Sequence, residues 1–285
     1  RLNELMSGHT SFKIGGPADI LVLPESIEQL REVLKVVKET VVPLTLLGNG
    51  SNVLVRDKGI RGIVIKLGNM LRHFYEAEDL LVFGSGYSLA LASYKAMECG
   101  RTGMEFAVGI PGSIGGAVYM NAGAYDGEMQ NIVNCVKVMD LQGNERVLTA
   151  EELNFGYRKT SLQNSGLIVT EVTLKMPSGN KDEIKSKMDD FSHRRISKQP
   201  LEMPSAGSMF KRPPGYFAGT LIDQAGLKGY TVGGAQISTK HAGFVVNVGG
   251  ATAADVLQLI KDVQTKIKAG VGVELQPEVL VIGEE

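Results

Sequence analysis

The sequence contains two glycine-rich stretches whose residue types suit the binding of a phosphate group. Residues 109–117 read Gly-Ile-Pro-Gly-Ser-Ile-Gly-Gly-Ala, so five of nine positions are glycine or proline. Glycine lets the main chain approach a ligand closely and turn its N–H groups towards an anion. Residues 46–55 place Gly-Asn-Gly-Ser-Asn between two apolar runs. A tight turn that only packs against a neighbouring element is the alternative for either stretch alone.

Neither stretch is a common nucleotide-binding motif. Neither has the Gly-x-Gly-x-x-Gly spacing, and no Lys-Ser or Lys-Thr pair follows the glycines as in a Walker loop. Two phosphate-type loops in one chain predict a dinucleotide with a pyrophosphate, held by a fold other than a Rossmann unit.

Three polar residues stand among glycine and apolar neighbours and could act on a substrate. Arg158 follows Phe-Gly-Tyr, Ser208 lies in Ala-Gly-Ser-Met-Phe, and Glu278 lies in an apolar C-terminal stretch that predicts a strand. By local sequence alone, a surface ion pair is the more usual role for Arg158, and satisfying the backbone of a turn is the more usual role for Ser208. A carboxylate buried in a strand is costly unless it is paired, so a function or a salt bridge must account for Glu278.

Together these segments make the chain similar to the UDP-N-acetylenolpyruvoylglucosamine reductase family, flavoenzymes of peptidoglycan precursor synthesis. The resemblance covers essentially the whole chain, because the matching segments follow the family's order. They are Asn3 with residues 10–16, then 46–55, 109–125, 155–158, 206–211, 221–229 and 277–279.

The resemblance implies a reaction and roles for the three polar residues. In this family NADPH reduces a non-covalently bound FAD, which passes hydride to the enolpyruvyl group of UDP-N-acetylglucosamine enolpyruvate and yields UDP-N-acetylmuramate. Arg158 and Glu278 resemble the residues that stabilise the charge developing on the substrate carboxylate, with Glu278 protonated because burial disfavours its anion. Ser208 resembles the proton donor, assisted by Lys198 or Lys211.

The resemblance also implies binding residues. The FAD is expected to contact Leu46, Gly48, Asn49, Gly50, Ser51, Asn52, Gly109, Pro111, Gly112, Ser113, Gly115, Gly116, Asn121 and Ala122. The UDP-sugar is expected to contact Tyr125, Lys198, Arg212, Lys228, Lys240, His241 and Asn247. A lone lysine or histidine is more often a surface residue than a ligand contact, so each substrate candidate keeps that alternative.

The chain departs from some members of the family at one place. Those members carry an inserted loop whose tyrosine closes over the substrate, whereas the stretch from Val169 to Pro200 is short and contains no tyrosine. The chain therefore resembles the shorter subclass, which lacks this lid. Gln276 stands where many relatives have glutamate, and Arg212 stands where others have asparagine.

Two other functions stay open at this point. One is a different flavin oxidoreductase on the same scaffold, which would oxidise a sugar or hydroxy acid and pass electrons to oxygen or a carrier. The other is a non-catalytic module that binds flavin or a nucleotide sugar, whose bound FAD would not be bleached by NADPH.

The elements that must position these residues follow from apolar patterning. Helices are predicted after the capping residues Ser26, Ser88 and Thr252, over 27–39, 89–99 and 252–268, and a further helix over 181–197. Strands are predicted at 18–23, 45–47, 53–55, 62–66, 80–83, 133–139, 145–148, 167–174, 230–237 and 242–248. This order favours mixed sheets over a doubly wound parallel sheet.

The predicted fold class is α+β: a two-lobed FAD-binding domain of the vanillyl-alcohol-oxidase/PCMH type, followed by a C-terminal α+β substrate domain. The lobes are expected at 1–69 and 70–177, and the substrate domain at 178–285, from which Glu278 returns to the active site. Thirty basic against 31 acidic residues give a net charge of −1, so no overall field draws in nucleic acid or a membrane. A cytoplasmic monomer without a metal site is expected, with its two cysteines reduced.

Overall fold

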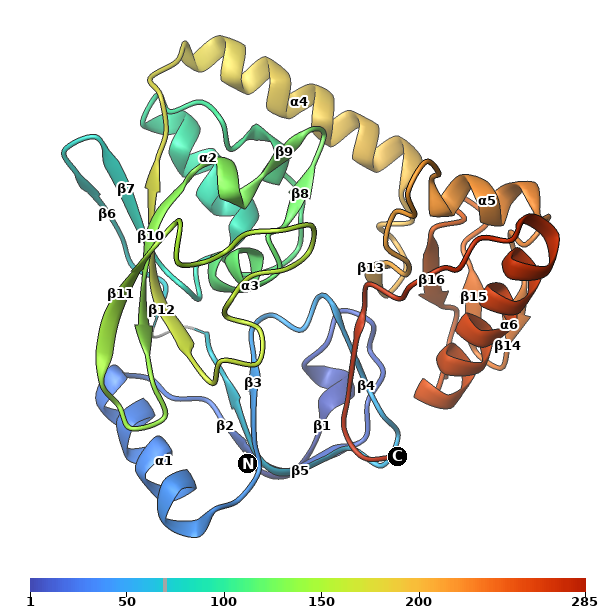
Figure 1. Cartoon of the computed structure of the whole chain (residues 1–285), viewed down its shortest axis with the longest axis horizontal. Coiled ribbons are helices and arrows are strands. Elements are labelled where there is room, and N and C mark those ends of the chain that lie inside the picture. Colours follow the sequence, from blue (N-terminus) through green and yellow to red (C-terminus); the bar gives the residue numbers. More distant parts are fainter. Residues whose placement is uncertain (69–70) are drawn as a thin grey trace. The chain divides into compact units, whose positions relative to one another are not determined.

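The computed structural model describes residues 1–68 and 71–285, which group by their contacts into two compact units (Figure 1). Unit 1 consists of Arg1–Leu21, Gly50–Val64 and Ile196–Glu285, and unit 2 consists of Val22–Asn49 and Ile65–Arg195. Each unit is therefore assembled from stretches that are separate in sequence. The predicted boundary between the two FAD-binding lobes, at residues 69 and 70, lies outside the described residues.

Unit 2 is built on a five-stranded sheet in the order β11-β10-β12-β7-β6, in which all neighbours are antiparallel. Its strands are β6 (Phe74–Ala77), β7 (Leu80–Gly84), β10 (Val133–Met139), β11 (Glu145–Thr149) and β12 (Ile168–Lys175). Its helices are α1 (Ile27–Thr40), α2 (Leu89–Glu98), α3 (Ile114–Tyr119) and α4 (Lys181–Lys198), of which the last turn of α4 belongs to unit 1. Shorter elements are β3 (Leu44–Leu47), η3 (Glu105–Ala107), β8 (Gly123–Ala124), β9 (Gly127–Glu128) and η4 (Met129–Asn131).

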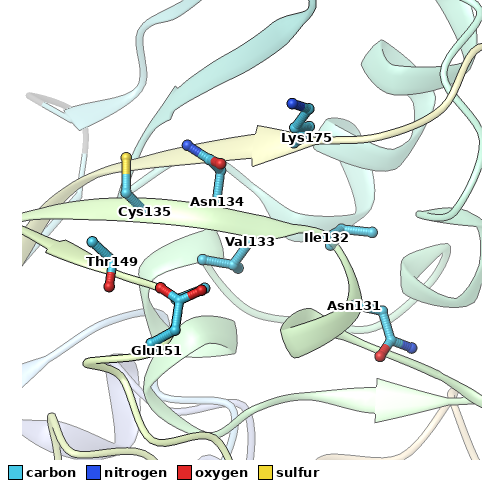
Figure 2. A pocket seen from close by; sticks show the side chains of 9 residues that line it. Asn131, Ile132, Val133, Asn134, Cys135, Thr149, Glu151 and Lys175 are labelled. Carbon is cyan, nitrogen blue, oxygen red and sulfur yellow. The ribbon is translucent and has the colours of Figure 1, made fainter.

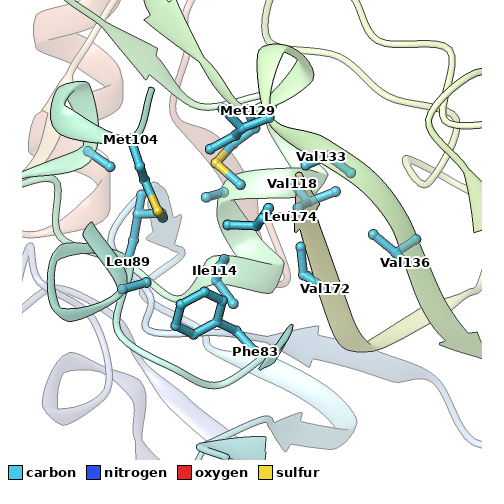
Figure 3. Packing of buried hydrophobic residues seen from close by; sticks show 14 of the residues in the cluster. Phe83, Leu89, Met104, Ile114, Val118, Met129, Val133, Val136, Val172 and Leu174 are labelled. Carbon is cyan, nitrogen blue, oxygen red and sulfur yellow. The ribbon is translucent and has the colours of Figure 1, made fainter. Parts of the chain in front are cut away.

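The core of unit 2 forms where α2 and α3 cover one face of this sheet. Phe83 from β7, Ile114 and Val118 from α3, and Val172 from β12 are all buried and point towards one another (Figure 3). Val136 of β10 completes this layer. The apolar positions that predicted these strands are thus the positions that hold α3, and with it the glycine-rich loop before it, against the sheet.

The predicted helix starts in unit 2 are confirmed. The Ser26 side chain accepts a hydrogen bond from the Gln29 N–H at 3.2 Å and caps α1. Ser88 caps α2 in the same way, accepting from the Leu91 N–H at 3.4 Å. Such side chains satisfy backbone donors that a helix leaves open at its first turn.

Unit 1 contains a four-stranded antiparallel sheet in the order β13-β16-β15-β14. The strands are β13 (Ser205–Ser208), β14 (Thr231–Val232), β15 (Ala235–Ile237) and β16 (Phe244–Asn247), and the helices are α5 (Ala218–Gln224) and α6 (Ala253–Val271). The N-terminal stretches contribute β1 (Leu2–Leu5), η1 (Met6–Gly8), β2 (Pro17–Val22), β4 (Val53–Val55) and β5 (Ile60–Lys66), of which the last residue of β2 and the last two of β5 belong to unit 2. The final strand β17 (Leu280–Ile282) returns to pair with β4 in parallel, with Leu280 opposite Val53.

Helix α6 begins where the sequence predicts it and is tied to the N-terminal part of the same unit. Thr252 and Asp255 form a capping box, in which each side chain accepts a hydrogen bond from the other's backbone N–H. The Asp57 carboxylate accepts hydrogen bonds from the Ala253 and Ala254 N–H groups at 2.7 and 2.9 Å. A carboxylate at a helix N-terminus is stabilised by the helix dipole, so this contact fixes α6 against the turn after β4.

Two sequence expectations in unit 1 need correction. The strand predicted over 230–237 is two strands, because the main chain turns at Gly233, which has φ +54°, and Gly234 packs too closely against Ala251 for a side chain. Glu278 precedes β17 rather than lying within a strand, and its side chain is only partly buried.

Candidate active site

The two glycine-rich stretches come together within unit 2. A Cβ atom added at Gly48 would lie 3.0 Å from the Ser113 hydroxyl oxygen. Ser113 is buried, and its hydroxyl accepts a hydrogen bond from the Gly116 N–H at 3.3 Å, which caps α3. The predicted pyrophosphate loop and the predicted flavin loop therefore touch, as a common dinucleotide site requires.

The 109–117 loop presents its main chain at the surface while its small side chains pack inward. Gly109, Pro111 and Gly116 are exposed. Gly115 is buried, and an added Cβ there would come within 2.6 Å of the Ser85 Cβ. Glycine at 115 thus lets the loop pack closely on Ser85, and the exposed glycines leave main-chain groups open to a cofactor bound through main-chain contacts.

The remaining predicted cofactor residues have varied surroundings. Leu46, Gly112 and Ala122 are half-buried in unit 2, and Asn49 is exposed. Asn121 is fully buried. Gly50, Ser51 and Asn52 belong to unit 1, so the 46–55 loop crosses from one unit to the other.

The Thr10–Gly16 segment explains how the unit 1 part of this loop is held. The Ser11 N–H donates to the Gly50 carbonyl at 3.0 Å, and the Ser11 hydroxyl donates to the Ser205 carbonyl at 2.7 Å. Gly50 is buried with φ +68°, and an added Cβ would meet the His9 carbonyl at 2.3 Å. One N-terminal turn thus connects the cofactor loop to β13, the strand that ends at Ser208.

Ser208 and Glu278 come together in unit 1. Ser208 is exposed at the end of β13, and the Glu278 N–H donates to the carbonyl of the next residue, Met209, at 2.9 Å. The Asn52 side chain donates to the Glu278 carbonyl at 3.3 Å. The Lys211 N–H bonds to the Gln276 carbonyl at 2.8 Å, which places this lysine on the same pair of segments. The segments that carry Ser208, Glu278 and Lys211 therefore lie side by side, next to Asn52 of the cofactor loop.

Arg158 lies in unit 2, where backbone carbonyls orient its guanidinium group. Its Nη1 and Nη2 atoms donate to the carbonyls of Asn121 and Gly123 at 3.4 and 3.1 Å. Its own backbone adopts a left-handed conformation with φ +55°. The Gln163 amide donates to the Arg158 carbonyl at 3.1 Å. These two carbonyls orient the guanidinium group within unit 2.

His241 is the centre of the substrate candidates in unit 1. Its Nδ1 accepts a hydrogen bond from the Gly243 N–H at 3.0 Å, so the neutral ring carries its proton on Nε2. Burial lowers the pKa of His241, and the charges of Lys228 and Lys198 act in the same direction, against Asp223. Since the Met209 N–H donates to the Gly243 carbonyl at 2.8 Å, this turn lies next to Ser208.

We expect His241 to make the stability of the protein depend on pH. Because its pKa is lower in the folded chain, the unfolded chain binds more protons below about pH 6.5, and the contribution of the neutral ring is lost as the pH falls through the folded-state pKa. His241→Asn keeps an acceptor near the Nδ1 position but does not titrate. Urea unfolding at about pH 7.5 and about pH 5.5 should show a smaller loss of stability for this variant. An equal loss in both proteins would contradict the prediction.

The other substrate candidates already have partners within the chain. The Lys240 ammonium donates to the Ile196 carbonyl at 2.8 Å, and Lys228 forms an ion pair with Asp223 at 2.8 Å. The Asn247 side chain accepts from two backbone N–H groups and donates to the Phe12 carbonyl at 3.3 Å. The Arg212 guanidinium stacks over the Phe217 ring at 4.0 Å. Asn247 therefore has a clear structural role, and its substrate contact stays a prediction.

Tyr125 and Arg195 form a cluster in unit 2, of which only Tyr125 was predicted from the sequence. The Tyr125 ring stacks on Phe191 with centroids 4.4 Å apart, and Arg195 lies over the same tyrosine ring. Arg195 is 7% exposed, and its side chain lies against Gly109. An arginine in a charged helix gives no sequence signal of burial, so this residue was missed.

A separate hollow of about 440 Å³ lies on unit 2 beside β10 and contains none of the predicted site residues (Figure 2). Asn134, Cys135, Glu151 and Lys175 line it.

Among the described residues, no helix is long and apolar enough to cross a membrane. The stretch from Val169 to Pro200 consists mainly of β12 and α4, joined by residues 176–180.

Comparison with known proteins agrees with this geometry. The family profile "FAD binding domain" matches residues 18–149, and "UDP-N-acetylenolpyruvoylglucosamine reductase, C-terminal domain" matches residues 199–282. The reductase of Clostridioides difficile (strain 630) is 49% identical over 285 residues, covering 100% of this chain and 94% of its own length. That of Clostridium perfringens (strain SM101 / Type A) is 52% identical over 280 residues, covering 98% and 92%.

A solved structure gives the same result. The crystal structure of the reductase from Thermus caldophilus superposes with a TM-score of 0.84 at 40% identity, covering 98% of this chain and 97% of that one. The predicted fold class and FAD cofactor are thereby confirmed. With matches of this identity along its whole length, the chain belongs to the UDP-N-acetylenolpyruvoylglucosamine reductase family of FAD-dependent oxidoreductases.

Proposed function

We propose that the chain reduces UDP-N-acetylglucosamine enolpyruvate to UDP-N-acetylmuramate at the expense of NADPH, with Arg158, Ser208 and Glu278 as its catalytic residues. The observation that supports this best is the placement of Ser208 and Glu278 on two hydrogen-bonded segments beside Asn52 of the cofactor loop. Bound FAD would supply the hydride transfer from NADPH to the terminal carbon of the enolpyruvyl double bond. The chain itself must then handle one negative charge and one proton.

Arg158 is suited to the negative charge. Hydride addition to the double bond moves an electron pair towards the substrate carboxylate, which becomes an enolate. A guanidinium group stabilises two oxygens of this kind in a forked geometry. Because the carbonyls of Asn121 and Gly123 fix two of its nitrogens beforehand, little reorganisation is needed when the charge develops.

Ser208 is suited to the proton. Ser208 is exposed, so it is open to a bound substrate, and protonation of the carbon that becomes the lactyl stereocentre would complete the addition of one hydride and one proton. A serine hydroxyl is a weak acid, and Lys211 on the adjoining segment is the neighbour suited to replace its proton. Glu278, on the segment whose N–H bonds to the Met209 carbonyl, is the third group proposed to stabilise the enolate.

The finer assignments extend this proposal. Residues 1–69 and 70–177 would form the FAD-binding lobes, and residues 178–285 would bind the UDP-sugar through the groups around His241. The cofactor and substrate residues named in the sequence analysis would make the contacts expected of them. NADPH and the substrate would use the flavin in turn, in a cytoplasmic monomer.

The absorption spectrum of the FAD-loaded protein under nitrogen tests the proposal. NADPH should bleach the flavin, and UDP-N-acetylglucosamine enolpyruvate should restore its absorbance within the same cuvette. Bleaching without recovery would contradict the proposed substrate and favour an oxidoreductase of another class. Bound FAD that NADPH does not bleach would favour a binding module without catalysis.

A further inference from the structure

Asn121 forms hydrogen bonds both with the guanidinium group of Arg158 and with the turn that carries this arginine. Its backbone carbonyl accepts a hydrogen bond from Arg158 Nη1 at 3.4 Å. Its side-chain Nδ2 donates to the carbonyl of Gly156 at 3.0 Å, two residues before Arg158. A single residue therefore contacts the guanidinium group with its main chain and the arginine-bearing turn with its side chain.

The Asn121 side chain is enclosed by the protein. The residue is 0% exposed, and Nδ2 also donates to Glu128 Oε2 at 3.2 Å while Oδ1 accepts from the Gln130 N–H at 3.0 Å. Three partners satisfy an amide well, and a buried amide that lost them would be costly. The side chain is thus committed to contacts inside unit 2 and presents no polar atom at the surface.

The backbone around Asn121 also requires a particular residue. Its φ of +42° lies in the left-handed region, which asparagine tolerates better than most other residues. This conformation places the carbonyls of Asn121 and Gly123 where Arg158 can donate to both. The turn from Gly156 to Lys159, which carries Arg158, is closed by two backbone hydrogen bonds of 2.9 and 3.1 Å.

We infer that Asn121 is a positioning residue for Arg158, and that its side chain fixes the orientation of the guanidinium group rather than binding FAD. This inference rests on the catalytic role proposed above for Arg158. The turn that carries Arg158 is anchored through the Gly156 carbonyl, and the guanidinium is anchored through the Asn121 carbonyl, so a shift of either moves the charge away from the substrate carboxylate. Displacements of about 1 Å can lower a catalytic rate about 100-fold.

Asn121→Asp is the test, because it keeps the shape and the acceptor for Gln130 but removes both Nδ2 donors. Flavin reduction by NADPH and flavin reoxidation by UDP-N-acetylglucosamine enolpyruvate are measured separately by stopped-flow absorbance. Reoxidation should slow about 10- to 100-fold more than reduction does. Asn164→Asp is the matched control, since Asn164 is exposed and also has a left-handed backbone with φ +63°, and it should alter neither rate.

The same measurement in an Arg158→Ala background separates positioning from general damage. If Asn121 acts through Arg158, Asn121→Asp should have less than about a twofold further effect on reoxidation there. An equal loss in both backgrounds would overturn the inference, as would unchanged reoxidation in the single variant. Should the aspartate variant fail to fold, Asn121→Gly, which tolerates the backbone and lacks the donors, takes its place with the same expected outcomes.

Failure of this inference differs from failure of the proposed function. If Arg158→Ala alone leaves reoxidation unchanged, the role of Arg158 is wrong and the inference falls with it. If Arg158→Ala slows reoxidation and Asn121→Asp does not, only the inference is overturned. Weakened FAD binding by Asn121→Asp, with both half-reactions slowed equally, would return Asn121 to the cofactor contacts.

Discussion

Replacement of Ser208 by alanine should leave a yellow protein that NADPH bleaches at the normal rate and that its substrate barely reoxidises. The hydroxyl is exposed at the end of β13 and is proposed to deliver the proton that completes the reduction. A positioned general acid contributes about 10²–10⁴-fold to a rate, so we expect reoxidation to fall by this factor. Single-turnover mixing of NADPH-reduced enzyme with UDP-N-acetylglucosamine enolpyruvate measures it directly.

Ser205→Ala provides the matched control for this variant. Ser205 lies in the same strand, and its contact with Ser11 is made by its backbone carbonyl, which alanine retains. Both half-reactions should therefore stay within about twofold of the unaltered protein. If Ser208→Ala turned over normally, the proton would have to come from another group, and Lys211 on the adjoining segment would be the next candidate.

Replacement of Arg158 by alanine should have the second largest effect and should act on the same half-reaction. The loss of one preorganised donor to a developing oxyanion typically costs about 10²–10³-fold in rate. We expect this loss in reoxidation, with FAD binding retained and reduction by NADPH reduced far less. Stopped-flow absorbance and the intensity of the flavin spectrum report the three quantities together.

Two further variants show whether the geometry of Arg158 matters beyond its charge. Arg158→Lys keeps the positive charge but cannot bond two carbonyls and a carboxylate in one plane, so only part of the rate should return. Arg146→Ala removes an exposed arginine of β11 in the same unit and should change neither half-reaction. Full activity in the lysine variant would show that charge alone suffices and would contradict the forked arrangement.

The sequence determined the local structure and the chemistry. Ser26, Ser88 and Thr252 are side chains that satisfy the open N–H groups of a first helical turn, so the starts of α1, α2 and α6 were predictable. The strand over 133–139 was predicted correctly because its apolar residues pack locally against one sheet face. The two glycine-rich stretches predicted a dinucleotide, the family resemblance implied that it is FAD, and the family comparison confirms this cofactor.

Only the tertiary structure shows which segments that are distant in the sequence lie next to one another. Contacts between Ser11 and Ser205, or between Asn52 and Glu278, join segments nearly 200 or more residues apart, and no local pattern encodes such pairs. Glu278 was misplaced into a strand because an apolar run does not reveal where pairing with β4 begins, which is at Leu280. Burial of Asn121 and Arg195 was likewise hidden, because a polar residue is tolerated inside a protein only by partners that folding brings to it.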